Sequence, residues 1–208
     1  KEVVGGKCPP LARLQFAVAY ADPAPSNARN KASSFKANFL LGYCDGKFYV
    51  YTGFLDHVTN DEFVEWFYNL RDYAGERVQV YYFIENNTLQ DPFYEQVFLP
   101  MFAAHARERG FIGITPDVRC KPPKFERIEG NLEPLIRQSR LVLNADEREN
   151  PHMKRLEEQF LLLNRQMKSP ADGPDCIEGG VWIINQKIST LSEGSYTIGR
   201  RHHASKRF

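Results

Sequence analysis

The sequence has little that would mark a zinc site, a disulfide scaffold or a membrane protein. Its four cysteines are spread singly, with no CxxC pair, at Cys8, Cys44, Cys120 and Cys176. This spacing excludes a zinc knuckle and predicts reduced thiols. No apolar run approaches the roughly 20 residues that cross a bilayer, and the opening KEVVGGKCPP lacks the apolar stretch of a secretory signal. We therefore expect a soluble intracellular protein.

A strong net charge and a phosphate-binding loop are also lacking. The 27 Lys and Arg residues are balanced by 26 Asp and Glu residues, which leaves a formal net charge of +1. This balance neither indicates nor excludes nucleic acid, since a bound metal and a local basic stripe can offset an acidic site. No GxxxxGK[ST] motif occurs, so we expect no ATP binding. With 208 residues, 42% of them hydrophobic, the chain fits one domain with a sizeable core.

Hydrophobic patterns predict an α/β fold in which a mixed central sheet has helices on both faces. From Leu14, the segment LQFAVAYADP is apolar on both strand faces, as a buried central strand is. Runs over 35–44 and 47–55 are joined by Asp45-Gly46, which favours a hairpin. A capping box at Thr59 and Glu62 predicts a helix that ends near residue 75.

The rest of the chain predicts further strands and helices in alternation. Strands are expected in RVQVYYFIEN, FIGIT and RLVLN. The expected helices run from Asp91-Pro92 toward residue 110 with a kink at Pro100, over 132–138 after a loop VRCKPPKFERI, from Asn150-Pro151 to Met167, and from a start within 172–174. The basic segment after residue 190 is expected to be a mobile tail.

Four acidic residues stand at the ends of expected elements, where side chains distant in sequence can meet. Asp22 follows the first buried strand, Glu85 ends VYYFIE, and Asp172 and Asp175 open the last helix. Taken singly, each has an ordinary explanation as a turn residue, a solvent-facing strand end or a helix N-cap. Taken together, they favour a pocket of carboxylates, whose oxygens suit Mg²⁺ or Mn²⁺ better than zinc. Two such ions can hydrolyse a phosphodiester.

Three segments that contain these acids resemble a known family. AYADPA, FIENN and PADGPDCIEGGVWII look like the three acidic motifs of the nuclease domain of tailed-bacteriophage terminase large subunits, and KFERIEGNLEPLIRQSRLVL is similar to the stretch between the second and third motifs. The likeness runs in order from Phe16 to Asn185. It implies a ribonuclease H-like nuclease domain over 14–190, an N-terminal extension over 1–13 and a tail over 191–208.

The resemblance implies a metal-dependent endodeoxyribonuclease that cuts concatemeric double-stranded DNA with two Mg²⁺ or Mn²⁺ ions. Asp22, Glu85, Asp172 and Asp175 would be both the catalytic residues and the metal ligands. The implied partners are double-stranded DNA, a portal protein and the terminase small subunit in the cytoplasm of a host cell. An ATPase domain of the same polypeptide is expected to lie outside this sequence.

The sequence departs from the family pattern at the start of the last helix. Ala171-Asp172 stands where the family often has paired aspartates, and Cys176 replaces the common alanine. Ligation from this helix then depends on Asp172 and Asp175, which are three residues apart and can share one helical face. Glu178 continues the spacing, and we interpret it as a helix-surface acid.

Basic residues near the acids are candidates for contacts with DNA phosphates. They lie after the first strand and in the long loop, and each could equally be an ordinary solvated charge. Lys124 is the strongest candidate because it lies in the KFERI stretch that resembles the family. The residues predicted to bind DNA are Lys31, Lys36, Lys121, Lys124 and Arg127.

Two other functions fit the same sequence. One is a different ribonuclease H-like nuclease of the resolvase or transposase type. The other is a non-catalytic module that docks on a portal protein or on DNA and uses the acids only to stabilise its fold.

Overall fold

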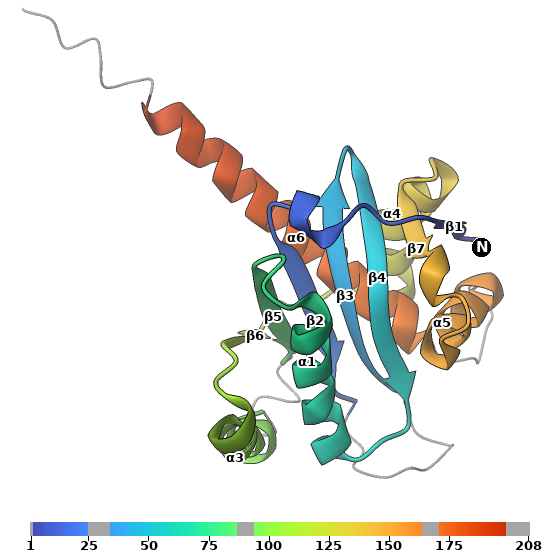
Figure 1. Ribbon diagram of the computed structural model, residues 1–208. Coiled ribbons are helices and arrows are strands. Elements are labelled where there is room, and N and C mark those ends of the chain that lie inside the picture. The colour runs from blue at the N-terminus through green and yellow to red at the C-terminus, as the bar shows by residue number, and fades with distance from the viewer. Residues whose placement is uncertain (1, 25–33, 87–93, 164–170, 199–208) are drawn as a thin grey trace, which may run out of the picture.

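The computed structural model describes residues 2–24, 34–86, 94–163 and 171–198, with side chains described up to residue 191 (Figure 1). One mixed sheet of seven strands, in the order β1-β7-β4-β3-β2-β5-β6, forms the centre of the molecule. Its strands are β1 (Val4–Gly6), β2 (Ala17–Asp22), β3 (Lys36–Cys44), β4 (Lys47–Asp56), β5 (Val80–Glu85), β6 (Ile114–Asp117) and β7 (Leu141–Asn144). Strand β3 is antiparallel to both β2 and β4, whereas β5 runs parallel to β2 and β6 runs parallel to β5.

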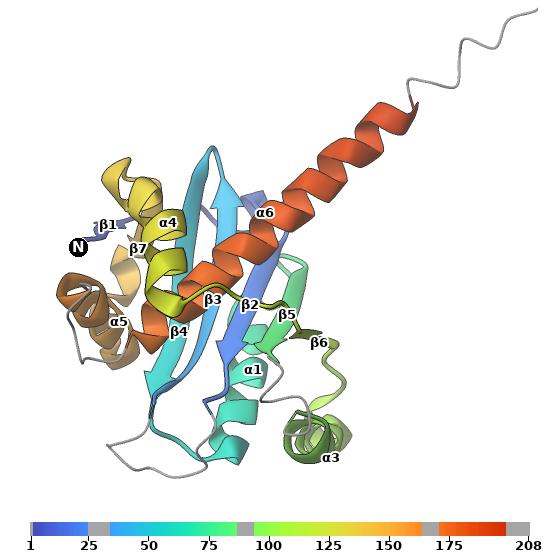
Figure 2. The same ribbon diagram turned by 180° about the vertical axis from the view of Figure 1, so that it is seen from behind.

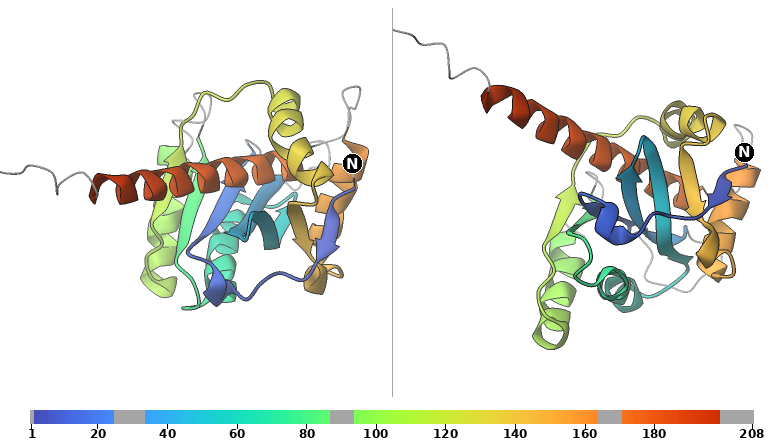
Figure 3. Two further views of the ribbon diagram at one scale, coloured as in Figure 1. Left: turned by 90° about the horizontal axis from the view of Figure 1, so that it is seen from above. Right: turned by 45° about the horizontal axis from the view of Figure 1, so that its top comes forward.

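Helices cover both faces of this sheet, as the sequence predicts. The α-helices are α1 (Asn60–Ala74), α3 (Leu99–Arg109), α4 (Lys124–Arg137), α5 (Pro151–Leu162) and α6 (Asp172–Ile198). Helices α1 and α3 share one hydrophobic core with the sheet, and α4, α5 and α6 share another on the opposite face. Figure 2 shows α6 crossing that second face, and Figure 3 shows its C-terminal part continuing beyond the sheet. No helix in the described part of the chain is both long and apolar enough to span a membrane.

Strand β2 is buried on both sides because alternate residues enter the two cores. Val18 and Tyr20 belong to the core under α6, while Ala17, Ala19 and Ala21 belong to the core under α1. All five side chains are fully buried. The structure therefore confirms the predicted central strand. Because side chains alternate along it, Asp22 points to the same face of the sheet as Tyr20.

Two local predictions are confirmed in detail. At the N-terminus of α1, the Thr59 side chain accepts a hydrogen bond from the Glu62 amide while the Glu62 side chain accepts from the Thr59 amide. The hairpin between β3 and β4 turns at Asp45 and Gly46, whose φ angles are 50° and 79°. Positive φ at both positions is what a two-residue hairpin turn of type I′ requires.

Three segments differ from the sequence predictions. Helix α4 begins at Lys124 and not near residue 132, because Ile128, Leu132 and Leu135 continue one buried face that Gly130 and Pro134 obscure in the sequence. Part of the expected N-terminal extension joins the sheet, since β1 pairs with β7 through its backbone. Helix α6 continues to Ile198, eight residues into the expected tail.

The expected kink at Pro100 is replaced by a change of helix type. A π-helical segment, Tyr94–Phe98, precedes α3, and Pro100 lies in the first turn of α3, where its missing N–H costs little. The expected start of this helix at Asp91-Pro92, the residue Met167 and the last ten residues of the tail lie outside the described residues.

Gly179 allows α6 to lie close against β2. A Cβ atom at this position would overlap the ring of Tyr20, which is fully buried and cannot move toward solvent. We expect Gly179→Ala to destabilise the protein by about 1–3 kcal/mol, the usual cost of overpacking a core.

Gly130→Ala is the matched control in α4, because a Cβ there has nothing within 4 Å and alanine favours a helix. In denaturant unfolding, Gly179→Ala should have a lower free energy of unfolding than the wild type, and Gly130→Ala a higher one. Similar stabilities for both would contradict the close approach of α6.

Candidate metal centre

Two of the predicted acids lie at the same edge of the sheet, on the same face. Asp22 ends β2 and Glu85 ends β5, and these strands are parallel neighbours that pair Ala21 with Ile84. Because side chains alternate along a strand, Asp22 shares the face of Tyr20 and Glu85 shares that of Phe83. Tyr20 and Phe83 both pack on the α6 side of the sheet. Both carboxylates therefore meet the first turn of α6.

Asp175 in that first turn completes a group of three carboxylates. Each of Asp22, Glu85 and Asp175 offers a carboxylate oxygen that lies within 4.8 Å of the others. Cys176, the next residue of α6, anchors the turn by donating from Sγ to the backbone oxygen of Tyr20 at 3.0 Å. The predicted convergence of acids from the two ends of the chain is thus present in the structure.

Asp172 lies next to this group but is not one of its three members. Its Oδ2 accepts a hydrogen bond from the Phe35 amide at 2.8 Å, and its Oδ1 accepts one from Lys124 Nζ at 2.6 Å. Lys124 Nζ also lies 3.3 Å from Asp175 Oδ2. Asp172 is therefore connected to the carboxylate group through Lys124, and its role as a metal ligand stays a prediction.

The group carries excess negative charge that affects protonation. Burial raises the pKa of Asp22 to about 7, and the charges of Glu85, Asp175 and Asp172 act in the same direction while Lys124 opposes them. For Lys124, burial lowers the pKa, but the charges of Asp175, Asp172 and Asp22 outweigh this and raise it overall. Crowded carboxylates that attract protons in this way also attract cations.

Three of the residues predicted to bind DNA face these carboxylates. Lys121 Nζ lies 2.6 Å from Glu85 Oε2, Lys124 joins Asp172 to Asp175, and Arg127 contacts Asp175. The side chains of Lys121 and Arg127 are 8% exposed, whereas that of Lys124 is 38% exposed. Lys124 is therefore the best placed of the three to reach a phosphate.

Lys36 has a structural position that the sequence did not predict. It is 1% exposed and its Nζ donates to the backbone oxygens of Pro23 at 2.6 Å and Ala24 at 3.0 Å. Lys36 thus holds the turn that follows Asp22, and such burial does not fit the predicted contact with DNA phosphates. Lys31 lies outside the described residues.

Two acids at the site were missed or misread in the sequence. Asp117 ends β6 opposite Glu85, is 5% exposed and accepts a hydrogen bond from the Tyr20 hydroxyl at 2.5 Å. Glu178 was interpreted as a surface acid, which is wrong: it is 1% exposed and accepts hydrogen bonds from Arg127 at 2.9 Å and Asn131 at 2.8 Å. Position at a strand end could have indicated Asp117, but no sequence signal pairs Glu178 with Arg127.

The donor set fits a hard divalent cation. All three converging groups are carboxylates, the oxygen ligands that Mg²⁺ and Mn²⁺ prefer. Glu85 Oε2 and Asp175 Oδ1 are both buried. Lys121 lies at ion-pair distance from the first of these oxygens and Arg127 lies at ion-pair distance from the second. A divalent cation bound by these carboxylates would therefore share the two oxygens with basic side chains or displace them.

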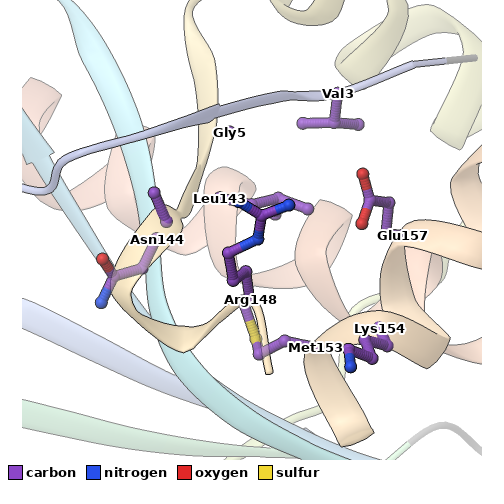
Figure 4. Close-up of a pocket in the computed structure, with 9 residues that line it drawn as sticks. Val3, Gly5, Leu143, Asn144, Arg148, Met153, Lys154 and Glu157 are labelled. Atoms are coloured by element: carbon purple, nitrogen blue, oxygen red, sulfur yellow. The ribbon is translucent and has the colours of Figure 1, made fainter. Parts of the chain in front are cut away.

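A hollow elsewhere on the described surface is not part of this centre. Figure 4 shows this hollow, of about 280 Å³, between β1, β7 and α5, with Arg148, Lys154 and Glu157 among its lining residues. None of the converging carboxylates lines it, and Lys154 is already paired with Glu149 at the surface. This hollow therefore lies apart from the three converging carboxylates.

The strands form a mixed α/β sheet with helices on both faces, and carboxylates from two parallel neighbouring strands and from a crossing helix meet at one end of it. No protein-family model matches the sequence, and no curated protein matches it either.

Solved structures supply the comparison. The human cytomegalovirus terminase nuclease domain aligns with a TM-score of 0.60 and 14% identity over 81% of this chain and 83% of that one. A manganese-soaked, inhibitor-bound form of the same domain aligns with a TM-score of 0.59 and 13% identity, covering 82% and 83% of the two chains. The large terminase of a thermophilic bacteriophage aligns with a TM-score of 0.52 and 12% identity over 89% of this chain and 41% of its own. The chain thus has the fold of terminase nuclease domains, which confirms the predicted fold class.

Proposed function

We propose that this chain is a metal-dependent endonuclease that cuts double-stranded DNA during the packaging of a viral genome. The observation that carries the proposal is the meeting of Asp22, Glu85 and Asp175 within 4.8 Å. The shared fold supports it, because the human cytomegalovirus terminase nuclease domain has the same fold and two of its three aligned structures were soaked with manganese.

Acidic residues from three elements of the fold would bind the divalent cations. Asp22 and Glu85 offer their carboxylates from two rigid strands, and Asp175 offers its own from α6. Two divalent cations bound there would activate the attacking water and neutralise the leaving oxygen of the phosphodiester. Lys124 holds Asp172 beside the group, and we keep Asp172 as a proposed fourth ligand.

Lys124, the most exposed of the cations at the site, would contact the DNA backbone. Lys121 and Arg127, which are buried beside Glu85 and Asp175, would add positive charge that attracts the same DNA phosphates. Contacts with phosphates carry little sequence information, so we expect cleavage with weak sequence preference. In packaging, the ATPase motor, the portal protein and the terminase small subunit would decide where the cut falls.

Cleavage of supercoiled plasmid tests the proposal. With Mn²⁺ or Mg²⁺, the purified chain should convert the plasmid into nicked and linear forms, and EDTA should stop this because the carboxylates alone cannot activate water. An intact plasmid at every cation concentration, with a folded protein, would count against the proposal.

The two alternatives give different results in the same experiments. A resolvase would cut a four-way DNA junction faster than a linear duplex of the same length. A docking module would bind a portal protein or DNA but show no heat of Mn²⁺ binding in calorimetry. Equal cutting of both substrates together with measurable Mn²⁺ binding favours the packaging nuclease.

A further inference from the structure

Lys121 lies between the metal centre and a second polar network that the proposed chemistry does not use. It belongs to the segment that joins β6 to α4, and its side chain is 8% exposed. Its Nζ lies 2.6 Å from Glu85 Oε2 and donates a hydrogen bond to the Tyr20 hydroxyl at 2.9 Å. One buried ammonium thus contacts both a member of the carboxylate group and a core tyrosine.

Tyr20 is held so that its hydroxyl can accept this bond. Its own proton is donated to Asp117 Oδ2 at 2.5 Å, which leaves the oxygen lone pairs for Lys121. Asp117 is fixed in turn by Arg119, whose Nε donates to both carboxylate oxygens at 2.9 Å and whose guanidinium lies 3.8 Å from the centre of the Trp182 ring. A continuous polar chain therefore runs from Arg119 through Asp117 and Tyr20 to Lys121.

The two contacts of Lys121 differ in kind. The contact with Tyr20 is a hydrogen bond, whereas Glu85 Oε2 accepts no hydrogen bond from any described residue and is met only at ion-pair distance. Lys121 is therefore anchored to Tyr20 and presents its charge to Glu85. A divalent cation that binds Glu85 Oε2 must therefore share this oxygen with the ammonium or displace it.

We propose that Lys121 is a positioning residue that holds Glu85 in place in the metal-free protein and competes with the divalent cation for that carboxylate. Tyr20 and Asp117 keep the ammonium beside Glu85. The inference rests on the proposed function only in requiring a divalent cation at the carboxylates, and it does not depend on DNA cleavage.

The proposal predicts that removal of the lysine charge strengthens metal binding. In Lys121→Met and Lys121→Gln, the cation no longer displaces an ammonium from Glu85, so Mn²⁺ affinity should rise by roughly tenfold. Tyr20→Phe keeps the charge but removes its anchor, and we expect an increase of about threefold. A lysine with a merely structural role would give weaker binding or no change.

Isothermal titration of the whole chain with MnCl₂, without DNA, tests this. Lys154→Met is the matched control, because it removes a lysine that pairs with Glu149 on the surface, and its affinity should equal that of the wild type. A thermal melt in EDTA establishes that each variant is folded. Lys121→Gln preserves a hydrogen-bond donor toward Tyr20 and serves where Lys121→Met does not fold.

The outcomes separate this inference from the proposed function. Tighter binding by both Lys121 variants supports competition, and unchanged or weaker binding by a folded variant overturns it. Wild-type affinity in Tyr20→Phe overturns the anchoring by Tyr20. If the wild type itself binds no Mn²⁺, the proposed metal centre fails, whatever the Lys121 variants show.

Discussion

Asp22→Asn is expected to lower the rate of DNA cleavage by on the order of a thousandfold, while it makes the metal-free protein more stable. The loss of rate follows from the loss of a carboxylate that would hold the cations, on which several kcal/mol of transition-state stabilisation depend. The gain in stability follows because the substituted asparagine would carry no charge beside Glu85 and Asp175. A single substitution should thus move activity and stability in opposite directions.

The pKa of Asp22 determines how the free energy of unfolding should change with pH. The pKa of Asp22 is about 7 in the folded protein, above its ordinary value of 3.8, so the folded state holds this proton more tightly than the unfolded chain does. The stability that comes from holding this proton on Asp22 is fully present below about pH 4 and is lost as the pH rises through about 7. The metal-free wild type should therefore lose stability over this window, and Asp22→Asn should lose much less. Mn²⁺ should stabilise the wild type more at about pH 8 than at about pH 5.

Thermal melts in EDTA and in Mn²⁺, together with plasmid cleavage, measure these effects. Asp45→Asn is the matched control, since Asp45 lies in the exposed β3–β4 turn at a φ of 50° that asparagine also adopts readily. The control should cleave DNA and respond to Mn²⁺ like the wild type. Equal rates of DNA cleavage by the Asp22 and Asp45 variants would show that Asp22 is not a catalytic residue.

The candidate metal centre could be predicted where strand order and side-chain alternation determine it. The apolar run before Asp22 predicts a central strand, and a carboxylate at the end of such a strand lies at a sheet edge where other strands also end. Glu85 follows from the same reasoning, and Asp175 follows from its place in the first turn of a helix. These positions depend on local patterns that a single sequence contains.

Asp117 shows how far local patterns reach. The sequence predicts a strand in FIGIT, and Asp117 follows it closely, but this short segment with its Pro116 does not reveal that β6 pairs with β5 and places Asp117 opposite Glu85. Lys36 fails for a related reason. A lysine after a polar loop predicts a solvated charge, and only the packing of β3 against the turn after Asp22 buries it.

Glu178 fails because helical spacing gives a face and not a neighbour. Its spacing from Asp175 predicts the same side of α6, but its partner Arg127 is 51 positions away on α4. The sequence pattern predicts a loop up to Ile128, which places Arg127 outside the helix, whereas α4 begins at Lys124. Without the correct start of α4, Arg127 cannot be recognised as the partner of the buried Glu178.

Arg127 gives the second large effect, this time on folding. It contacts both Asp175 and Glu178, which are 4% and 1% exposed, and its Nε donates to the backbone oxygen of Pro122 at 3.2 Å. Arg127→Met would leave these two acids buried without their main cation. We expect the free energy of unfolding to fall by about 3–5 kcal/mol, the usual cost of breaking a buried ion pair from one side.

Denaturant unfolding in EDTA measures this loss. Arg137→Met is the control, because Arg137 also lies on α4 but pairs with Glu133 in an exposed i,i+4 bridge that contributes little. The Arg137 variant should remain within about 0.5 kcal/mol of the wild type. An Arg127 variant as stable as the wild type would show that the ion pairs of Arg127 do not stabilise the packing of α4 on α6.

A second substitution and a cation distinguish the two acids that Arg127 neutralises. Glu178→Gln keeps an acceptor for Asn131 Nδ2, which lies 2.8 Å from Glu178 Oε1, but removes the buried charge. Combined with Arg127→Met, it should recover a large part of the lost stability, since removal of both charges of a buried pair costs little. Mn²⁺ should recover another part in the single variant, because a cation at the carboxylates neutralises Asp175 and leaves Glu178 uncompensated. Recovery by Mn²⁺ alone to the wild-type value would show that the cost of losing Arg127 comes from Asp175 and not from Glu178, and the Glu178→Gln change would then add nothing.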